Sequence, residues 1–222
     1  MTKLSFLEKN YYTTKPKYLV ILLHGYGSNG SNLLELSQYF EKFIPESKFI
    51  APNAIEPWEG GFFDSYQWFS LAKWGSKRDI KIVKDEIKKA NETLKSFILD
   101  QLKLNNIEEK NLFLIGFSQG AMMAMYQGFI LPKKIAGVIS YSGKLILPEH
   151  IEEKILSKPD ICLIHGKKDS ILPFCNFEEA SNELLRIDNP FTSEPFDDLD
   201  HSINLDAIKA GINFIKKQLK NY

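Results

Sequence analysis

The chain has 222 residues, 44% of them hydrophobic, and its 28 basic residues balance 28 acidic residues to a formal net charge of +0. A chain of this length can bury a large core without disulfides or structural metals, so we expect residues 1–222 to form a single domain. The charge balance lacks the basic excess typical of proteins that bind nucleic acid or anionic lipid, and we expect no nucleic-acid partner.

Cysteine usage and apolar runs bear on the compartment in which the protein works. The two cysteines, Cys162 and Cys175, are too few for a disulfide framework, and neither belongs to a CxxC or Cys/His ligand motif. We therefore predict inert thiols, a reducing, cytoplasmic location and no bound metal. Residues 1–14 lack the apolar run of a signal peptide, and no run is long enough to cross a bilayer, so we expect no integral membrane segment.

The N-terminal part of the chain contains three strand-like stretches. Residues 4–14 alternate weakly and indicate an edge strand. Residues 18–23 are continuously apolar, which is typical of a strand buried on both faces, and residues 47–51 indicate a third strand.

A glycine-rich loop over residues 24–30 follows the first buried strand. Such loops can point several backbone N–H groups at one anion, so phosphate binding is one interpretation. The loop lacks the GxxxxGK[ST] pattern and no lysine closes it, which argues against nucleotide binding. We expect the next helix to be capped by Ser31 or Asn32 and to extend to about residue 43.

Residues 52–75 form a long segment without clear periodicity. A loop of this length in a compact domain is usually functional or disordered, and its many aromatic residues argue against disorder. Two compatible interpretations are a loop that packs aromatic side chains onto the core and a partly mobile wall over an apolar pocket. We expect this segment to lie near the active site.

The rest of the chain continues the alternation of helices and strands. Ser76 and Asp79 resemble a capping box at the start of the longest helix. The expected elements are a helix over residues 76–104, a strand over 111–116, a helix after Gly120, strands over 135–140 and 161–166, a helix over 176–186, a strand over 192–196 and a helix over 204–220. Alternation of this kind predicts an α/β fold whose mostly parallel central sheet is covered by helices on both faces.

The motif Gly116-Phe117-Ser118-Gln119-Gly120 lies between a predicted strand and a predicted helix. G-x-S-x-G in this context indicates a nucleophile elbow, a sharp turn that lifts the serine hydroxyl off the end of the strand. The two glycines would let strand and helix pack closely around the turn. The backbone N–H of Gln119, at the helix N-terminus, would face any negative charge that forms near Ser118. Because this short motif also occurs by chance, the rest of the chain must support the assignment.

A serine nucleophile needs a base to take its proton and a third group that orients the base. His201, in a loop after the last predicted strand, is the best candidate for the base. His24 and His165 each end a strand beside a glycine and are expected to hydrogen-bond locally. Asp169 follows a buried strand directly and is the best candidate for the orienting carboxylate.

Three further aspartates, Asp197, Asp198 and Asp200, lie closer to His201 in the sequence. We interpret them as a solvated acidic turn, with one of them as a fallback for the orienting role. The chain order of serine, aspartate and histidine is the order expected of an α/β-hydrolase.

Four motifs together resemble the carboxylesterase/phospholipase family that includes the acyl-protein thioesterases. They are residues 24–30, residues 116–121, His165-Gly166 with Asp169 and Pro173, and residues 200–203, and the similarity extends over nearly the whole chain, including residues 51–54. The resemblance implies a single-domain α/β-hydrolase fold without a cofactor. It also implies catalytic roles for Ser118 as nucleophile, Asp169 as orienting carboxylate and His201 as base, and an oxyanion hole formed by the backbone N–H groups of Tyr26 and Gln119.

Two features depart from the family pattern. Tyr26 stands where many members carry leucine, although only its backbone is needed for the oxyanion hole. Residues 58–74 also differ from the corresponding segment of the eukaryotic thioesterases.

The resemblance implies a serine hydrolase that cleaves carboxylic esters, and possible substrates are small esters, thioesters or lipid-like acyl compounds. We predict that five residues form the acyl pocket: Phe62, Phe63, Trp68, Phe69 and Leu172. Lysophospholipase or acyl-protein thioesterase activity would use the same chemistry. Acyl transfer to an acceptor other than water and a binding protein without turnover are further alternatives.

Residues 52–75, which we call the aromatic segment, are expected to act as a lid, a pocket wall or the contact of a homodimer.

Overall fold

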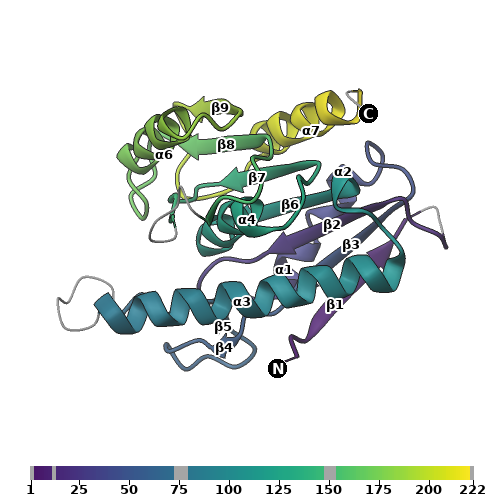
Figure 1. Ribbon diagram of the computed structural model, residues 1–222. Coiled ribbons are helices and arrows are strands. Elements are labelled where there is room, and N and C mark those ends of the chain that lie inside the picture. The colour runs from purple at the N-terminus through teal and green to yellow at the C-terminus, as the bar shows by residue number, and fades with distance from the viewer. Residues whose placement is uncertain (1–2, 12–13, 73–79, 148–153, 221–222) are drawn as a thin grey trace.

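The structure is a computed structural model that describes residues 3–11, 14–72, 80–147 and 154–220. Its centre is a seven-stranded sheet in the order β1-β3-β2-β6-β7-β8-β9 (Figure 1). The strands are β1 (Phe6–Asn10), β2 (Tyr18–Leu23), β3 (Ser47–Pro52), β6 (Leu112–Phe117), β7 (Gly137–Tyr141), β8 (Ile161–Gly166) and β9 (Phe191–Phe196). Only β1, at one edge, pairs antiparallel, so the predicted mostly parallel sheet is confirmed.

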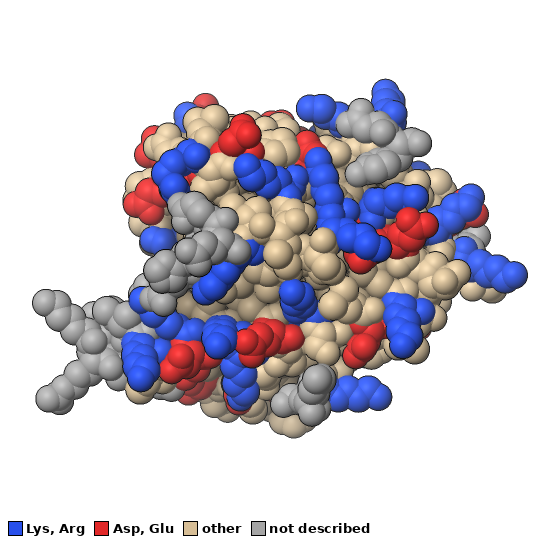
Figure 2. Space-filling view, in the orientation of Figure 1, with Lys and Arg blue, Asp and Glu red and all other residues tan. Residues whose placement is uncertain are grey.

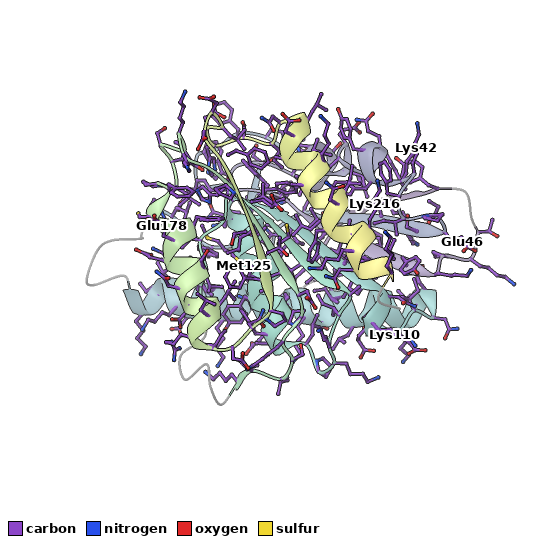
Figure 3. The ribbon with its side chains drawn as sticks, turned by 90° about the horizontal axis from the view of Figure 1, so that it is seen from above. Lys42, Glu46, Lys110, Met125, Glu178 and Lys216 are labelled. Atoms are coloured by element: carbon purple, nitrogen blue, oxygen red, sulfur yellow. The ribbon has the colours of Figure 1, made fainter. Side chains whose placement is uncertain are left out.

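Helices cover both faces of this sheet. The core on one face includes residues of α3 (Ile80–Asn105), α4 (Gln119–Ile130) and α6 (Cys175–Arg186). The core on the other face includes residues of α1 (Gly30–Leu34), α2 (Ser37–Phe40) and α7 (Leu205–Lys220). Figure 3 looks onto the β9 edge, with α6 and α7 on either side of it. In the part of the chain that the structure describes, no helix combines the length and apolarity needed to span a membrane.

Strand β2 shows why the central strands read as continuous apolar runs. Leu19, Ile21 and Leu23 pack into the core on one face, whereas Val20 and Leu22 pack into the core on the other. Successive side chains of a strand point to opposite faces, so a strand covered on both sides must be apolar at every position.

The helix predicted over residues 31–43 is wrong in extent and in its cap. It is divided into the short helices α1 and α2, because the N–H of Leu36 bonds the carbonyl of Leu33 at 3.0 Å and closes a turn. The cap is Asn29, whose side-chain oxygen accepts from the N–H of Asn32 at 2.9 Å.

The aromatic segment is more regular than its sequence indicated. Within its described residues, β4 (Glu56–Pro57) and β5 (Tyr66–Gln67) form a two-stranded antiparallel sheet. The two strands pair residues about ten positions apart through main-chain hydrogen bonds. A strand of only two residues is too short to show an alternation of apolar and polar side chains, so the sequence gives no sign of it. Residues 73–75, and the capping box proposed at Ser76 and Asp79, lie outside the described residues.

Candidate active site

The order of strands reverses direction at β2. The chain passes from β2 to β3 on one side, and β6 later pairs with β2 on the other side. Ligands bind at such switch points of parallel sheets. The loop after β2 and the turn after β6 therefore meet at this point, where His24 and Ser118 lie.

Ser118 occupies a sharp turn between β6 and α4. Its backbone has φ 53° and ψ −117°, a conformation that residues other than glycine rarely adopt. Its N–H donates to the carbonyl of Tyr141 at 2.9 Å, which anchors the turn to β7. A Cβ added at Gly120 would overlap the carbonyl oxygens of Leu23 and His24, so the close packing predicted at this glycine is confirmed.

His201 connects the serine to a carboxylate. Its Nε2 lies 3.0 Å from Ser118 Oγ, and its Nδ1 lies 2.7 Å from Asp169 Oδ2. A carboxylate only accepts hydrogen bonds, so Nδ1 carries the ring proton and donates it to Asp169. The neutral ring then presents the lone pair of Nε2 to the Ser118 hydroxyl, which is the arrangement that a general base requires.

The Asp169 carboxylate is buried and held by further hydrogen bonds. Its Oδ1 accepts from the N–H groups of Ile171 at 2.9 Å and Leu172 at 2.8 Å. His165 Nε2 lies 3.3 Å from Oδ2. These contacts fix the carboxylate in the orientation that meets His201.

The acidic turn near His201 is solvated, as the sequence indicated. The exposed carboxylates of Asp197 and Asp198 pair with Lys167 and Lys168, each at 2.7 Å. Asp169, and not this turn, is therefore the partner of His201 Nδ1.

His24 and His165, which lie at the ends of β2 and β8, form local hydrogen bonds, as predicted. His24 Nδ1 donates to the carbonyl of Gly25 at 2.8 Å, and its Nε2 accepts from the N–H of Ala54 at 2.9 Å. Burial lowers the pKa of His24 to about 4, so its ring is neutral near pH 7. His165 Nε2 donates to the carbonyl of Leu172 at 2.8 Å, and burial likewise lowers its pKa.

The loop after β2 lies against the serine turn. A Cβ added at Gly25 would come 3.4 Å from the Cβ of Ser118. Across the described ranges, no hydrogen bond occupies the backbone N–H of Tyr26 or of Gln119. Both donors are therefore free to bind an oxyanion formed beside Ser118.

The side chain of Gln119, for which the sequence offered no role, ties this turn to the aromatic segment. Its Oε1 accepts from the N–H of Trp68 at 2.9 Å, and its Nε2 donates to the carbonyl of Phe69 at 2.7 Å. The indole N–H of Trp68 also donates to the carbonyl of His24 at 3.0 Å. These partners lie about fifty residues apart in the chain, so no local pattern predicts them.

The residues of the predicted acyl pocket divide into two groups. Trp68 and Phe69 are buried and Leu172 is partly buried, whereas Phe62 is 71% exposed and Phe63 is 99% exposed. Trp68 and Phe69 are among the residues that line a cavity of about 420 Å³, whose lining contains none of the three residues Ser118, Asp169 and His201. Among the described residues, no group of three His, Cys, Asp or Glu side chains is arranged to hold a metal.

A family model described as phospholipase/carboxylesterase matches residues 11–219. The chain belongs to this family. It is therefore an esterase-type hydrolase with a single-domain α/β-hydrolase fold.

Among solved structures, the chain is similar to that of esterase PE8, with a TM-score of 0.88 and 33% identity over 97% of this chain and 99% of that one. It is 30% identical to acyl-protein thioesterase 1 of Debaryomyces hansenii, over 94% of each chain. It is 23% identical to esterase YpfH of Escherichia coli, over 89% of this chain and 82% of the relative.

Proposed function

We propose that Ser118, His201 and Asp169 are a catalytic triad that cleaves carboxylic esters through an acyl-enzyme. One observation carries this proposal, namely the continuous chain of contacts from Ser118 Oγ through His201 to Asp169, at 3.0 Å and 2.7 Å. A serine hydroxyl is a poor nucleophile at neutral pH, and this chain supplies both the base and its orientation.

In the first half of the cycle, Ser118 Oγ attacks the carbonyl carbon of the ester while its proton passes to His201 Nε2. The electron pair of the carbonyl moves onto oxygen, which accepts from the N–H groups of Tyr26 and Gln119. One such donor is typically worth about 3 kcal/mol of activation free energy. Asp169 stabilises the imidazolium that forms. When the tetrahedral intermediate collapses, His201 gives its proton to the leaving alkoxide and an alcohol departs.

In the second half, water replaces the alcohol. His201 Nε2 takes a proton from water as the water oxygen attacks the acyl carbon on Ser118. The same N–H groups hold the second oxyanion, and collapse returns the proton to Ser118 Oγ and releases the acid. No redox step or external cofactor enters this cycle.

Hydrolysis of p-nitrophenyl esters by wild type and Ser118→Ala tests the proposal. We expect the variant to lose at least about a thousandfold in kcat, since it lacks the nucleophile. Activity of Ser118→Ala within a few-fold of wild type would overturn the assignment.

Thioesters and lysophospholipids are substrates of the same chemistry. The relative from Debaryomyces hansenii is named an acyl-protein thioesterase, which favours thioesters as a second substrate class. Comparing matched oxygen esters and thioesters of acetate, octanoate and palmitate separates these classes. A preference for long chains supports a lipid-like or acyl-protein substrate, and a preference for short chains supports a small-molecule esterase.

Two alternatives of a different kind are tested with the same protein. A binding protein without turnover would not react with a fluorophosphonate, whereas an assembled triad is labelled at its serine. An acyltransferase would form new esters when alcohols are added, and product analysis would detect them. We retain a cytoplasmic location and a homodimer as predictions, which fractionation and sedimentation test respectively.

A further inference from the structure

We propose that Glu59 is a positioning residue for the oxyanion hole, because its carboxylate fixes the Tyr26 side chain and thereby aims the Tyr26 N–H at the reacting oxygen. This inference rests on the proposed function of Ser118 and adds a residue that the sequence motifs do not contain. Glu59 contacts neither the triad nor the substrate in this account, and it acts only through Tyr26.

The backbone at Tyr26 needs an external anchor. Tyr26 lies between Gly25 and Gly27, and Gly27 has a φ of +73°. Glycines on both sides give the chain wide freedom of φ and ψ, so the local sequence does not determine the direction of the Tyr26 N–H. A donor that stabilises an oxyanion must be aimed before the charge forms. Tertiary contacts must therefore hold this residue.

The side chain of Tyr26 provides those contacts. Its hydroxyl donates to Glu59 Oε1, and its ring packs edge-on against Trp58, with centroids 5.8 Å apart and an interplanar angle of 90°. The next residue reinforces the connection, since the N–H of Gly27 donates to the carbonyl of Tyr66 at 3.0 Å. Further along the loop, the carbonyl of Ser28 accepts from the N–H of Tyr66 at 2.8 Å, and Asn29 Nδ2 donates to the carbonyl of Asp64 at 2.9 Å. Side-chain and main-chain bonds together thus attach the loop after β2 to the β4–β5 hairpin, and the Tyr26 side chain is the contact made by the residue whose N–H must be aimed.

Glu59 is itself held by several donors. Besides Tyr26, its carboxylate accepts from Ser70 Oγ at 2.6 Å and from the N–H groups of Leu71 at 3.2 Å and Ala72 at 3.0 Å. Its own N–H donates to the side chain of Gln67 at 2.9 Å. Five hydrogen bonds therefore hold Glu59 in place although the residue is exposed.

The charge states suit this role near neutral pH. Burial would raise the pKa of Glu59, but the hydrogen bonds from Ser70, Tyr26, Ala72 and Leu71 outweigh it and lower the pKa to about 2. Burial and the bond to Glu59 raise the pKa of Tyr26 to about 12. The phenol therefore keeps its proton, and the carboxylate stays ionised, throughout the range in which esterases are assayed.

The same segment also holds the second donor of the oxyanion hole. Trp68 and Phe69, which precede Ser70, bond the side chain of Gln119, whose N–H is the other proposed donor. The segment from Glu56 to Ala72 thus connects both donors, and Glu59 is the residue in it that bonds the Tyr26 hydroxyl.

Two variants and two controls test the proposal. Tyr26→Phe removes only the hydroxyl, and Glu59→Gln keeps the shape of the side chain but removes its charge. Glu56→Gln is the control for charge, because this exposed carboxylate of the same hairpin pairs with Lys89 at 2.8 Å. Tyr39→Phe, at a surface position on α2, is the control for loss of a phenol. Each variant is compared with wild type in kcat and KM for p-nitrophenyl butyrate, in melting temperature, and in inhibition by a trifluoromethyl ketone that forms an oxyanion on Ser118.

We expect Tyr26→Phe to lower kcat roughly tenfold, since a displaced donor keeps part of its effect. Glu59→Gln should lower kcat by a smaller factor of about threefold, because its amide oxygen can still accept from the Tyr26 hydroxyl but without the charge that strengthens the bond. KM should change less than twofold, and the inhibition constant of the ketone should rise in parallel with the fall in kcat/KM. The double variant should lose less than the product of the two single losses, because both changes break one chain of contacts. Both controls should retain wild-type kinetics.

Unchanged kcat in Tyr26→Phe and Glu59→Gln would overturn the inference, as would multiplicative losses in the double variant. A loss of kcat without weaker ketone binding would also overturn it, because that pattern indicates general loosening of the structure. Failure of the proposed function is distinguishable, since wild type itself would then show no hydrolysis that depends on Ser118.

Discussion

Ser118 combines an unusual backbone conformation with a side-chain hydroxyl that is held by a hydrogen-bond contact to His201. Its positive φ costs free energy for a residue other than glycine, and the surrounding contacts, including the bond from its N–H to Tyr141, hold it there. The strained turn places the hydroxyl within 3.0 Å of His201 Nε2. The strained backbone therefore accompanies the contact on which the proposed triad depends.

The tautomer of His201 depends on Asp169, and Asp169→Asn tests this dependence. The amide oxygen of asparagine can still accept from the N–H groups of Ile171 and Leu172. Its NH₂ group then faces His201 Nδ1 and moves the ring proton to Nε2, which leaves no lone pair for Ser118. We expect kcat to fall roughly 10³–10⁴-fold.

Asp198→Asn is the matched control, because this exposed carboxylate pairs only with a surface lysine among its described contacts. It should retain wild-type kcat. An Asp169→Asn enzyme with more than about a tenth of wild-type kcat would show that the tautomer does not limit the reaction.

Glu59 also predicts a dependence of stability on pH. Its pKa in the folded protein is about 2, below its ordinary value of 4.5, so ionised Glu59 favours the folded state. This contribution is fully present above about pH 4.5 and is lost as the pH falls toward 2. The difference in unfolding free energy between wild type and Glu59→Gln, measured by urea denaturation, should therefore shrink steadily from pH 5 to pH 3. A difference that stays constant over this range would contradict the assigned pKa.

At the scale of elements, the close contact between α4 and the end of β2 positions the turn at Ser118 on the sheet. A Cβ at Gly120 would overlap backbone atoms of Leu23 and His24, which cannot rotate away. We expect Gly120→Ala to lower the unfolding free energy by roughly 3 kcal/mol or more, because α4 must move off the sheet.

Gly61→Ala is the comparison for this change. Gly61 has a φ of +78° and nothing within 4 Å of an added Cβ, so the variant should cost only about 1 kcal/mol of backbone strain. Chemical denaturation of both variants measures the difference. Equal losses would show that α4 does not pack on β2 as closely as described.

The elements that sequence predicts well are those with a strong pattern of their own. The apolar runs that became β2, β6 and β8 were located to within a residue, because strands buried on both faces must be apolar throughout. The β4–β5 hairpin was missed because its pairing depends on main-chain hydrogen bonds between two very short strands. The division between α1 and α2 was missed because their apolar residues keep a nearly helical spacing across the turn.

In the candidate site too, residues with a local sequence signal could be predicted, whereas a residue that depends on long-range contacts could not. Ser118, Asp169 and His201 follow predicted strands and carry side chains suited to one mechanism, so chain order and chemistry sufficed to select them. Glu59 carries no such signal, because it belongs to no short motif and its partner Tyr26 lies 33 residues away. Long-range contacts of exposed residues become visible only in three dimensions.

At the scale of the whole molecule, surface charge is mixed. Figure 2 shows basic and acidic side chains interspersed along α3 on this face. Residues of α3 take part in two ion pairs, Lys88 with Glu92 at 3.9 Å and Lys89 with Glu56 of β4 at 2.8 Å. This distribution agrees with the balanced composition of the chain.

The burial of one cysteine and the exposure of the other predict different reactivities for the two thiols. Cys162 is buried in β8, and burial raises its pKa to about 12, whereas Cys175 is exposed. A disulfide reagent such as DTNB at pH 8 should therefore react with one thiol per native chain and with the second only after unfolding. Cys175→Ser should leave no reactive thiol in the native protein. Rapid reaction of both thiols in wild type would show that the sheet opens readily.

The central claim is that Ser118 forms the covalent bond to the acyl group, and mapping of a covalent adduct tests it most directly. Native protein is treated with a fluorophosphonate, digested, and its peptides are analysed by mass spectrometry, with His201→Ala treated in parallel. We expect one adduct per chain, located on Ser118, together with complete loss of esterase activity and much slower labelling of the His201 variant. An adduct on another residue, or full esterase activity after Ser118 is labelled, would contradict it.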